Sequence, residues 1–243
     1  MRACRGVIGF VTRRLPPRLA RRAVTAHNVA PCKLAAPLND VNGMNTSAIA
    51  PVPPAFDAST SGKAGVWRPV RQYLRHTLPC ETLAWLLDPA SLTRRVVAVC
   101  PGRFRVEVVS QGWRRPLLNE ARVLGVPAAR YTFVRQVYLL CDERPWVFAR
   151  TVIPRTTLTG HERRLAHLHA RPLGEVLFAD PSMRRGEVEV AHLTPGDGLY
   201  HNATQQLAAK PAAIWGRRSL FTLSDKPLLV NEIFLPDIPP CLR

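Results

Sequence analysis

Three charged side chains stand inside apolar segments of this chain. They are Glu232 in 228–236 (LLVNEIFLP), Arg135 in 131–140 (YTFVRQVYLL) and Arg150 in 146–154 (WVFARTVIP). A buried ionised group without a partner is very unfavourable. Glu232 therefore needs a cationic or hydrogen-bonding partner, or else is protonated with a raised pKa. One acid and two cations on apolar strands are the side chains expected around a small anionic ligand.

Each of these charges also has a purely structural interpretation. Alternation with period two puts Arg135 among large apolar neighbours, where a long side chain can still extend to solvent at the margin of a sheet. The same holds for Arg150, which shares a face with Trp146, Phe148 and Val152. Glu232 can form a structural salt bridge to one of these arginines, because buried ion pairs need no function. The residues alone leave both interpretations open.

No motif for a metal or a nucleotide cofactor is present. His161-Glu162 is followed by His167, six residues after the first histidine rather than four, so the H-E-x-x-H zinc face is missing. Walker A, G-x-G-x-x-G and G-x-S-x-G patterns are also absent. We expect no cofactor and no metal. Arg217 and Arg218 are expected to be exposed strand arginines.

The positive charge is spread along the chain. Net charge is +17, of which residues 1–66 carry +7 from nine Lys/Arg and two Asp. A basic surface attracts an anionic metabolite as well as nucleic acid. Nucleic-acid binding would need aromatic side chains interleaved with exposed arginines, and the aromatics here fall mainly on apolar strand faces. We therefore expect no nucleic-acid partner.

The six cysteines form no C-x-x-C pair and no cluster with zinc spacing. Cys141 ends an apolar strand, where a free thiol behaves as a small hydrophobe. Scattered cysteines suit a reducing cytosol, and no apolar run approaches the roughly 20 residues of a membrane span. The sequence predicts a cytoplasmic protein without membrane insertion.

The composition changes near residue 66. Residues 1–66 are basic and then rich in proline and small polar residues, which predicts a disordered extension. We hypothesise that translation starts at Met44, inside this segment. Residues 67–243 are expected to form one domain. Its ordered structure is expected to begin near Trp67, where apolar residues recur at helical spacing.

Within 67–243 the turn signals predict hairpins. Segments 142–145 and 224–227 each join two apolar strands, and 103–109 alternates as a half-exposed strand. Short helices are expected at 81–87 and 161–169. Hairpins without β-α-β alternation favour an α+β domain with a central antiparallel sheet.

Several segments of the chain resemble those of the chorismate–pyruvate lyase family. The segments that carry the resemblance are DPASLT (88–93), 131–140, 146–154, TLTG (157–160), RPLGEVLF (171–178) and WGRRSLFTLSDKPLLVNEIFLP (215–236). The resemblance covers about 80–236. It implies a monomeric α+β fold whose helical flaps close over an internal site. It also implies conversion of chorismate to 4-hydroxybenzoate and pyruvate, the first step of ubiquinone biosynthesis, with no cofactor and with a tightly held product.

The resemblance assigns roles to the charged residues. Arg135 matches the arginine that holds the ring carboxylate of the ligand. Glu232 matches the acid at the other end of the ligand, near the oxygen that becomes the phenol. We add Arg150 as a second electrostatic contact. The expected catalytic residues are therefore Glu232, Arg135 and Arg150.

Two apolar positions complete the expected site, and a third is expected to affect how the ligand fits. Leu173 and Leu92 match flap residues that contact the ligand, and Leu92 stands where familiar members have methionine. Ala149 stands where they have glycine, which is expected to alter the fit of the ligand. The alternative function from another class is a non-enzymatic effector-binding domain of related fold. Such a regulator needs a winged helix-turn-helix, and residues 1–66 hold too little amphipathic helix to build one.

Overall fold

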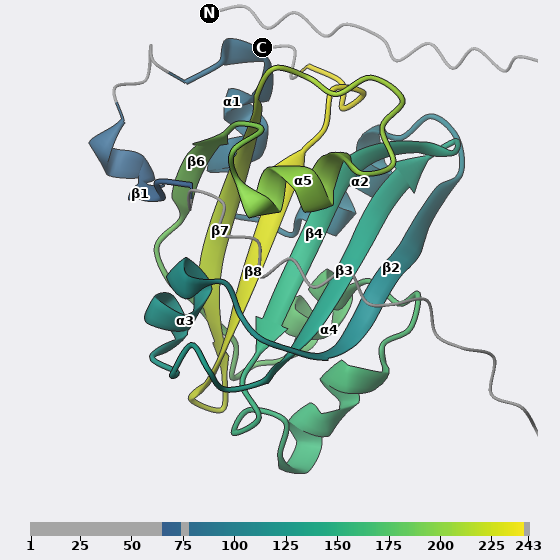
Figure 1. The fold of residues 1–243 in the computed structure, drawn as a ribbon. Helices are drawn as coiled ribbons and strands as arrows, with labels where there is room; N and C mark the ends of the chain where they lie inside the picture. Colours follow the sequence, from purple (N-terminus) through teal and green to yellow (C-terminus); the bar gives the residue numbers. More distant parts are fainter. Residues whose placement is uncertain (1–64, 74–77, 241–243) are drawn as a thin grey trace, which may run out of the picture. The chain divides into compact units, whose positions relative to one another are not determined.

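The computed structural model describes residues 65–73 and 78–240. Its centre is one antiparallel sheet with strand order β1-β6-β7-β8-β4-β3-β2, and β5 pairs with β7 (Figure 1). The strands are β1 (Arg68–Pro69), β2 (Phe104–Arg114), β3 (Thr132–Cys141), β4 (Arg144–Ile153), β5 (Arg184–Arg185), β6 (Glu189–Leu193), β7 (Ile214–Leu223) and β8 (Lys226–Phe234). The prediction of an α+β fold with a central antiparallel sheet is confirmed.

Short helices cover both faces of the sheet. They are the α-helices α1 (Cys80–Leu87), α2 (Leu92–Val99), α3 (Leu118–Leu124), α4 (Leu173–Ala179) and α5 (Gly198–Thr204), and the 3-10 helices η1 (Val70–Gln72) and η3 (Gly160–His167). In Figure 1, α3 and α5 lie in front of the sheet and α1, α2 and α4 behind it. Strand β3 is consequently buried along its whole length, because both of its faces are covered.

Two tight hairpins fix the register of the central strands. Asp142 and Glu143 turn β3 into β4, and Ser224 and Asp225 turn β7 into β8, all four with positive φ. Two-residue turns of this kind match the twist of the flanking strands. Leu223 pairs with Lys226 across the second turn, and the ladder continues without a shift.

A β-bulge near the start of β4 decides which residues face the site. Leu140 pairs with Pro145 but Leu139 pairs with Val147, so Trp146 is an extra residue in β4. A one-residue insertion moves the following side chains to the other face. The prediction that Trp146 shares a face with Arg150 is therefore wrong. Trp146 packs with Val137 and Leu139 in the core beside α1 and α2.

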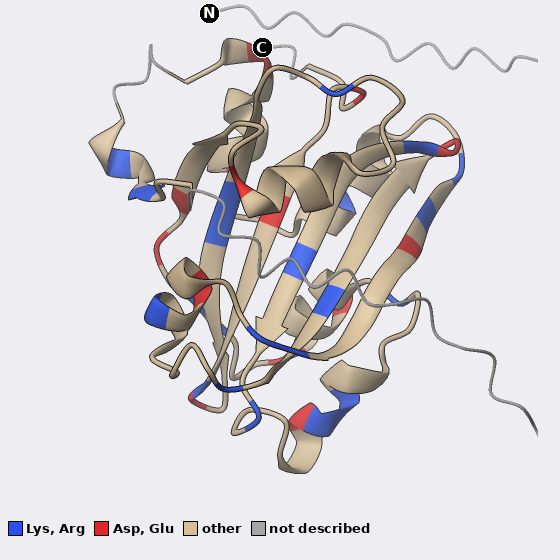
Figure 2. Cartoon of the chain, viewed as in Figure 1, with Lys and Arg blue, Asp and Glu red and all other residues tan. Residues whose placement is uncertain are grey.

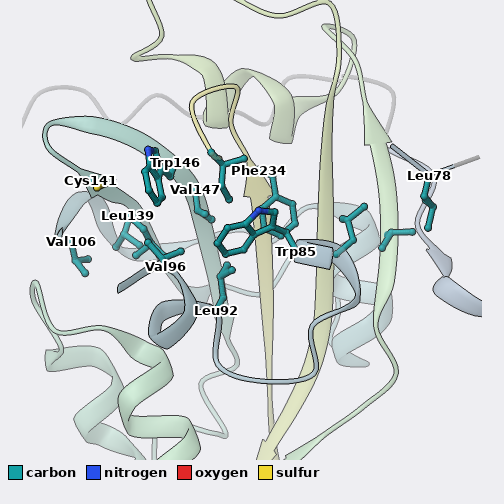
Figure 3. Close-up of a cluster of buried hydrophobic side chains, with 14 residues drawn as sticks. Leu78, Trp85, Leu92, Val96, Val106, Leu139, Cys141, Trp146, Val147 and Phe234 are labelled. Carbon is teal, nitrogen blue, oxygen red and sulfur yellow. The ribbon is translucent and has the colours of Figure 1, made fainter. Parts of the chain in front are cut away.

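Helix α2 is an element that the sequence pattern did not reveal. Ser91 caps its N-terminus by accepting a hydrogen bond from the Arg94 backbone N–H. Val96 and Leu92 lie in the same core as Trp85 of α1 and Phe234 of β8 (Figure 3). The helix expected after Trp67 is present only as the short 3-10 helix η1, which follows the two-residue strand β1, and residues 74–77 lie outside the described part of the chain.

The cysteine prediction needs a correction. Cys141 is not a free thiol but forms a disulfide with Cys100. Within residues 65–73 and 78–240, Cys80 is a free cysteine and is exposed. The proposed extension 1–66 and the proposed start at Met44 fall almost wholly outside the described residues. Over the described part of the chain, no helix has the length and apolar character needed to cross a bilayer.

Candidate functional site

A small cavity lies between the sheet and the pair α2 and α4, which we call the flaps. Its volume is about 50 Å³. Its polar lining is Arg135, Glu232, Thr93 and Thr151, and its apolar lining includes Val137, Leu139, Ala149, Val230 and Phe221 from the sheet and Leu92, Leu173 and Leu177 from the flaps. Strands far apart in the sequence thus meet at one enclosed space.

The flaps touch each other over this cavity. A methyl group placed on Gly174 of α4 would lie 3.0 Å from Ser91 Oγ and 3.1 Å from Thr93 Oγ1. These distances are tighter than ordinary van der Waals contact. The flaps therefore meet at Gly174, where glycine permits the close approach.

Arg135 is buried in the cavity wall without an acidic partner. Its side chain is 3% exposed, and its Nη2 donates to the carbonyl oxygens of His169 at 2.7 Å and Arg171 at 3.0 Å. Its Nε is buried without a hydrogen-bond partner. Burial lowers the pKa of Arg135 to about 10, so the guanidinium remains charged at neutral pH. Among the described residues no carboxylate forms a salt bridge with it.

Glu232 lies two strands away on the same face. It pairs with Ala149 of β4 and Arg217 of β7 in the ladders. Its Oε2 accepts a hydrogen bond from Arg217 Nε at 2.6 Å, which supplies the cationic partner expected for this carboxylate. No described residue donates to Oε1, and the side chain is 18% exposed. One oxygen is held, and the other is free to contact a ligand.

Arg217 and Arg218 are buried, so the prediction that they are exposed is wrong. Arg217 is 1% exposed, and its Nη1 donates to the carbonyl oxygens of Trp85 at 2.8 Å and Asp88 at 2.7 Å. Arg218 points to the other side of β7 and donates to Glu189 Oε2 at 2.7 Å. Figure 2 shows basic positions inside β3, β4 and β7 and an acidic one inside β8.

Arg150 does not face the cavity. It forms a two-pronged salt bridge with Glu120 of α3, at 2.8 Å from Nε and 3.0 Å from Nη2. Asn231 Nδ2 donates to the same carboxylate at 3.0 Å. The expectation that Arg150 makes a second contact with the ligand is contradicted by this placement. Its structural interpretation, a side chain that extends to solvent, is also wrong, because Arg150 is 4% exposed and pairs with Glu120.

The three expected apolar residues all line the cavity. Leu92 lies at the first turn of α2 and Leu173 at the first turn of α4, so each flap contributes one leucine. Ala149 lies directly opposite Glu232 in the ladder. The structure thus brings together Arg135, Glu232 and these apolar residues.

Arg217 was missed as a partner of Glu232, although the sequence held the signal. A two-residue turn at Ser224 and Asp225 makes Leu223 pair with Lys226. Counting back along both strands then places Arg217 opposite Glu232. Thr93 and Thr151 carried no comparable signal, because each is a single hydroxyl in no recognisable motif.

The arrangement suits a flat acid with one carboxylate. Arg135 presents a desolvated guanidinium, and Glu232 presents a free carboxylate oxygen elsewhere on the same wall. The cavity is smaller than the roughly 150 Å³ that holds benzene in an engineered apolar cavity. A ring-containing ligand would therefore need more room than this cavity offers.

Comparisons with known proteins agree with this geometry. The sequence profile of the family described as chorismate lyase matches residues 63–240. A protein from Methylococcus capsulatus (strain ATCC 33009 / NCIMB 11132 / Bath), named probable chorismate pyruvate-lyase, is 43% identical over 155 residues, which cover 64% of this chain and 94% of that protein. A protein of the same name from Azoarcus sp. (strain BH72) is 41% identical over 182 residues, covering 73% and 93%.

Among solved structures, the effector domain of PhnF from Mycobacterium smegmatis is similar, with 15% identity, coverage of 62% of this chain and 91% of that chain, and a TM-score of 0.46. The profile match spans most of the chain and includes every residue that lines the cavity. This protein is an enzyme of the chorismate lyase family.

Proposed function

We propose that this enzyme converts chorismate to 4-hydroxybenzoate and pyruvate, as the first step of ubiquinone biosynthesis. The names of the relatives support chorismate as the substrate. The observation that carries the proposal is Arg135, a buried guanidinium that lines the cavity and pairs with no carboxylate among the described residues. A carboxylate ligand would supply the missing negative charge.

Arg135 anchors the ring carboxylate of the substrate in this proposal. Its Nη2 is held by two backbone carbonyls, which fix the orientation of the guanidinium plane. Its Nε is buried and has no hydrogen-bond partner among the described residues, so a carboxylate oxygen that reached it would satisfy it. Guanidinium and carboxylate match in geometry, and such charge-assisted bonds are about twice as strong as neutral ones.

Glu232 acts at the other end of the ring. The bond that breaks joins a ring carbon to the ether oxygen, and its electrons leave with enolpyruvate, which takes up a proton to become pyruvate. The neighbouring ring carbon, which carries the hydroxyl, loses its hydrogen as a proton, and the ring becomes aromatic. Glu232, paired with Arg217, is a carboxylate that can accept that proton or a hydrogen bond from the hydroxyl.

The apolar walls and the flaps complete the proposed mechanism. Leu92 and Leu173 exclude water from the ring, which strengthens the contact with Arg135. The product keeps the same carboxylate and ring, so it also binds tightly. Opening of the flaps then limits turnover, and we expect a burst of product in the first turnover. Linear progress curves without product inhibition would contradict this part of the proposal.

The deciding experiment mixes the purified full chain with chorismate alone and follows 4-hydroxybenzoate by absorbance and pyruvate by a coupled assay. Equal amounts of both products support the proposal. Glu232→Gln is the matched variant, because it keeps the shape of the side chain but removes the base. Tight binding of 4-hydroxybenzoate with no turnover of chorismate would instead indicate the effector-binding alternative.

We also propose that the active enzyme is a monomer without a metal or cofactor. Light scattering at assay concentrations gives the mass of the particle, and activity after dialysis against a chelator tests the metal. A dimer, or activity lost with the chelator, would contradict this proposal.

A further inference from the structure

Arg217 makes three contacts that no other described arginine combines. Its Nε donates to Glu232 Oε2 at 2.6 Å, and its Nη1 donates to the carbonyl oxygens of Trp85 and Asp88. Asp88 begins the connector, residues 88–91, which joins α1 to α2. One guanidinium therefore touches both the acid of the cavity and the segment from which a flap begins.

Arg217 is buried, so loss of these contacts would leave its charge without compensation. The side chain is 1% exposed, and Glu232 is 18% exposed. An arginine stays charged when buried, and removal of its acidic partner would leave that charge uncompensated. The carboxylate of Glu232 thus lies 2.6 Å from a buried, fixed positive charge. Its second oxygen, Oε1, remains available to the ligand.

A second arginine donates hydrogen bonds to the same connector but none to Glu232. Arg185 of β5 donates from Nη1 to the carbonyl oxygens of Pro89 at 2.9 Å and Asp88 at 3.4 Å, and from Nε to Ser219 Oγ at 3.0 Å. Burial, together with the nearby charge of Arg217, lowers the pKa of Arg185. The connector thus has two cationic holders, of which Arg217 alone is linked to the acid.

We infer that Arg217 is a positioning residue for the reaction. It holds Glu232 as a carboxylate with one oxygen directed to the ligand, and it makes that placement depend on the seating of the connector at the base of α2. The inference rests on the proposed role of Glu232 at the reacting end of the ring. Arg217 thereby links the seating of this flap to the placement of the acid.

The charged surroundings of Glu232 decide how its protonation responds. Arg217 faces it from β7, Arg185 from β5, and Arg135 lines the same cavity from β3. Asp88 of the connector is paired with Arg95 of α2 at 2.8 Å. Replacing Arg217 by a neutral residue removes the one direct cationic contact, while burial remains. Glu232 then takes up a proton at higher pH than in the wild type.

The first test reads the protonation of Glu232 without turnover. Carbon-13 labelling of glutamate carboxyl groups gives one NMR signal per glutamate, and the signal absent from Glu232→Gln identifies Glu232. In Arg217→Met we expect its titration midpoint to rise by about one pH unit or more. Arg218→Met is the matched control: it removes the neighbouring buried arginine from the other face of β7 and leaves the midpoint unchanged. An unchanged midpoint in Arg217→Met overturns the inference.

The second test uses Arg217→Lys. This variant keeps the positive charge, so it can be measured even if Arg217→Met does not fold. A lysine cannot make the Nε and Nη1 contacts together. We expect kcat for chorismate to fall about tenfold or more, with the Kd of 4-hydroxybenzoate changed less than about threefold, because Arg135 still holds the carboxylate. Equal losses in kcat and affinity would indicate a merely structural residue.

Two further comparisons distinguish a failure of the inference about Arg217 from a failure of the proposed function. In Glu232→Gln, adding Arg217→Lys causes no further loss of kcat if both residues act as one unit, and fully additive losses contradict the inference. Arg185→Lys loosens the connector but leaves the Glu232 midpoint in place. If the wild type does not convert chorismate, the proposed function fails, and the NMR midpoint still decides the role of Arg217.

Discussion

Among the buried arginines of the sheet, Arg135 differs from Arg150, Arg217 and Arg218, each of which has an acid. Arg135→Ala should therefore weaken binding of 4-hydroxybenzoate by about 2–5 kcal/mol, as removal of one partner of a desolvated charge pair does. Arg135→Lys should also bind poorly, because an ammonium cannot reproduce the fork. Calorimetric titration measures both, with Arg218→Lys as the control. Wild-type affinity in Arg135→Ala would remove the anchor from the proposal.

For the buried salt bridge between Arg150 and Glu120 we expect the opposite behaviour, a loss of stability without a loss of substrate binding. Their salt bridge is buried on the far side of the sheet, with side chains 5% and 1% exposed. Glu120→Gln should lower the free energy of unfolding by about 3–5 kcal/mol, because it leaves the Arg150 charge unpaired. The KM for chorismate should change little. Urea unfolding and steady-state kinetics test the two halves, and a raised KM without loss of stability would place Arg150 in the site after all.

At the residue scale, the sequence predicts which charged residues line the site better than it predicts how those charges are paired. Charged residues inside apolar strands identify Arg135 and Glu232 because burial of a charge always needs an explanation. The role of Arg150 was not predictable in the same way, since it depends on the extra residue Trp146 in β4. Without that bulge the chain after the turn would place Arg150 opposite Arg135; with it, Thr151 takes that position.

At the scale of elements, the contact between the flaps predicts a defined effect of Gly174→Ala. Alanine stabilises a helix relative to glycine by about 1 kcal/mol, but its methyl group would press on Ser91 and Thr93. We expect unchanged or slightly raised thermal stability and a faster release of 4-hydroxybenzoate. Stopped-flow displacement measures the release rate. Gly196→Ala is the control, because nothing lies near that position, and slower release in Gly174→Ala would contradict the contact.

Elements differ in how well the sequence reveals them. Both hairpins follow from their turn residues and long apolar strands, and the structure confirms them. Helix α2 is no shorter than α1, which the sequence does reveal; its segment 92–99 contains β-branched residues and two arginines and is not assigned to a helix from the sequence. Its position depends on tertiary contacts that no local signal contains: the grip of Arg217 on Asp88 at one end and the Cys100 disulfide at the other.

For the whole molecule, the disulfide between Cys100 and Cys141 closes a loop of 41 residues. Cross-links of this kind typically contribute about 2–4 kcal/mol to stability. Cys100→Ser should lower the melting temperature measured without reductant, and a dithiol reductant should lower that of the wild type to the same value. Cys80→Ser is the control, since Cys80 is exposed and free. Identical melting curves with and without reductant would show that the bond is absent in solution.

That covalent link also constrains how the chamber can be entered. It ties the trailing end of α2 to the last residue of β3, and Arg217 and Arg185 hold the connector before its leading end. With α2 anchored at both ends, entry of a ring acid beside Ser91 and Gly174 would depend on movement of α4.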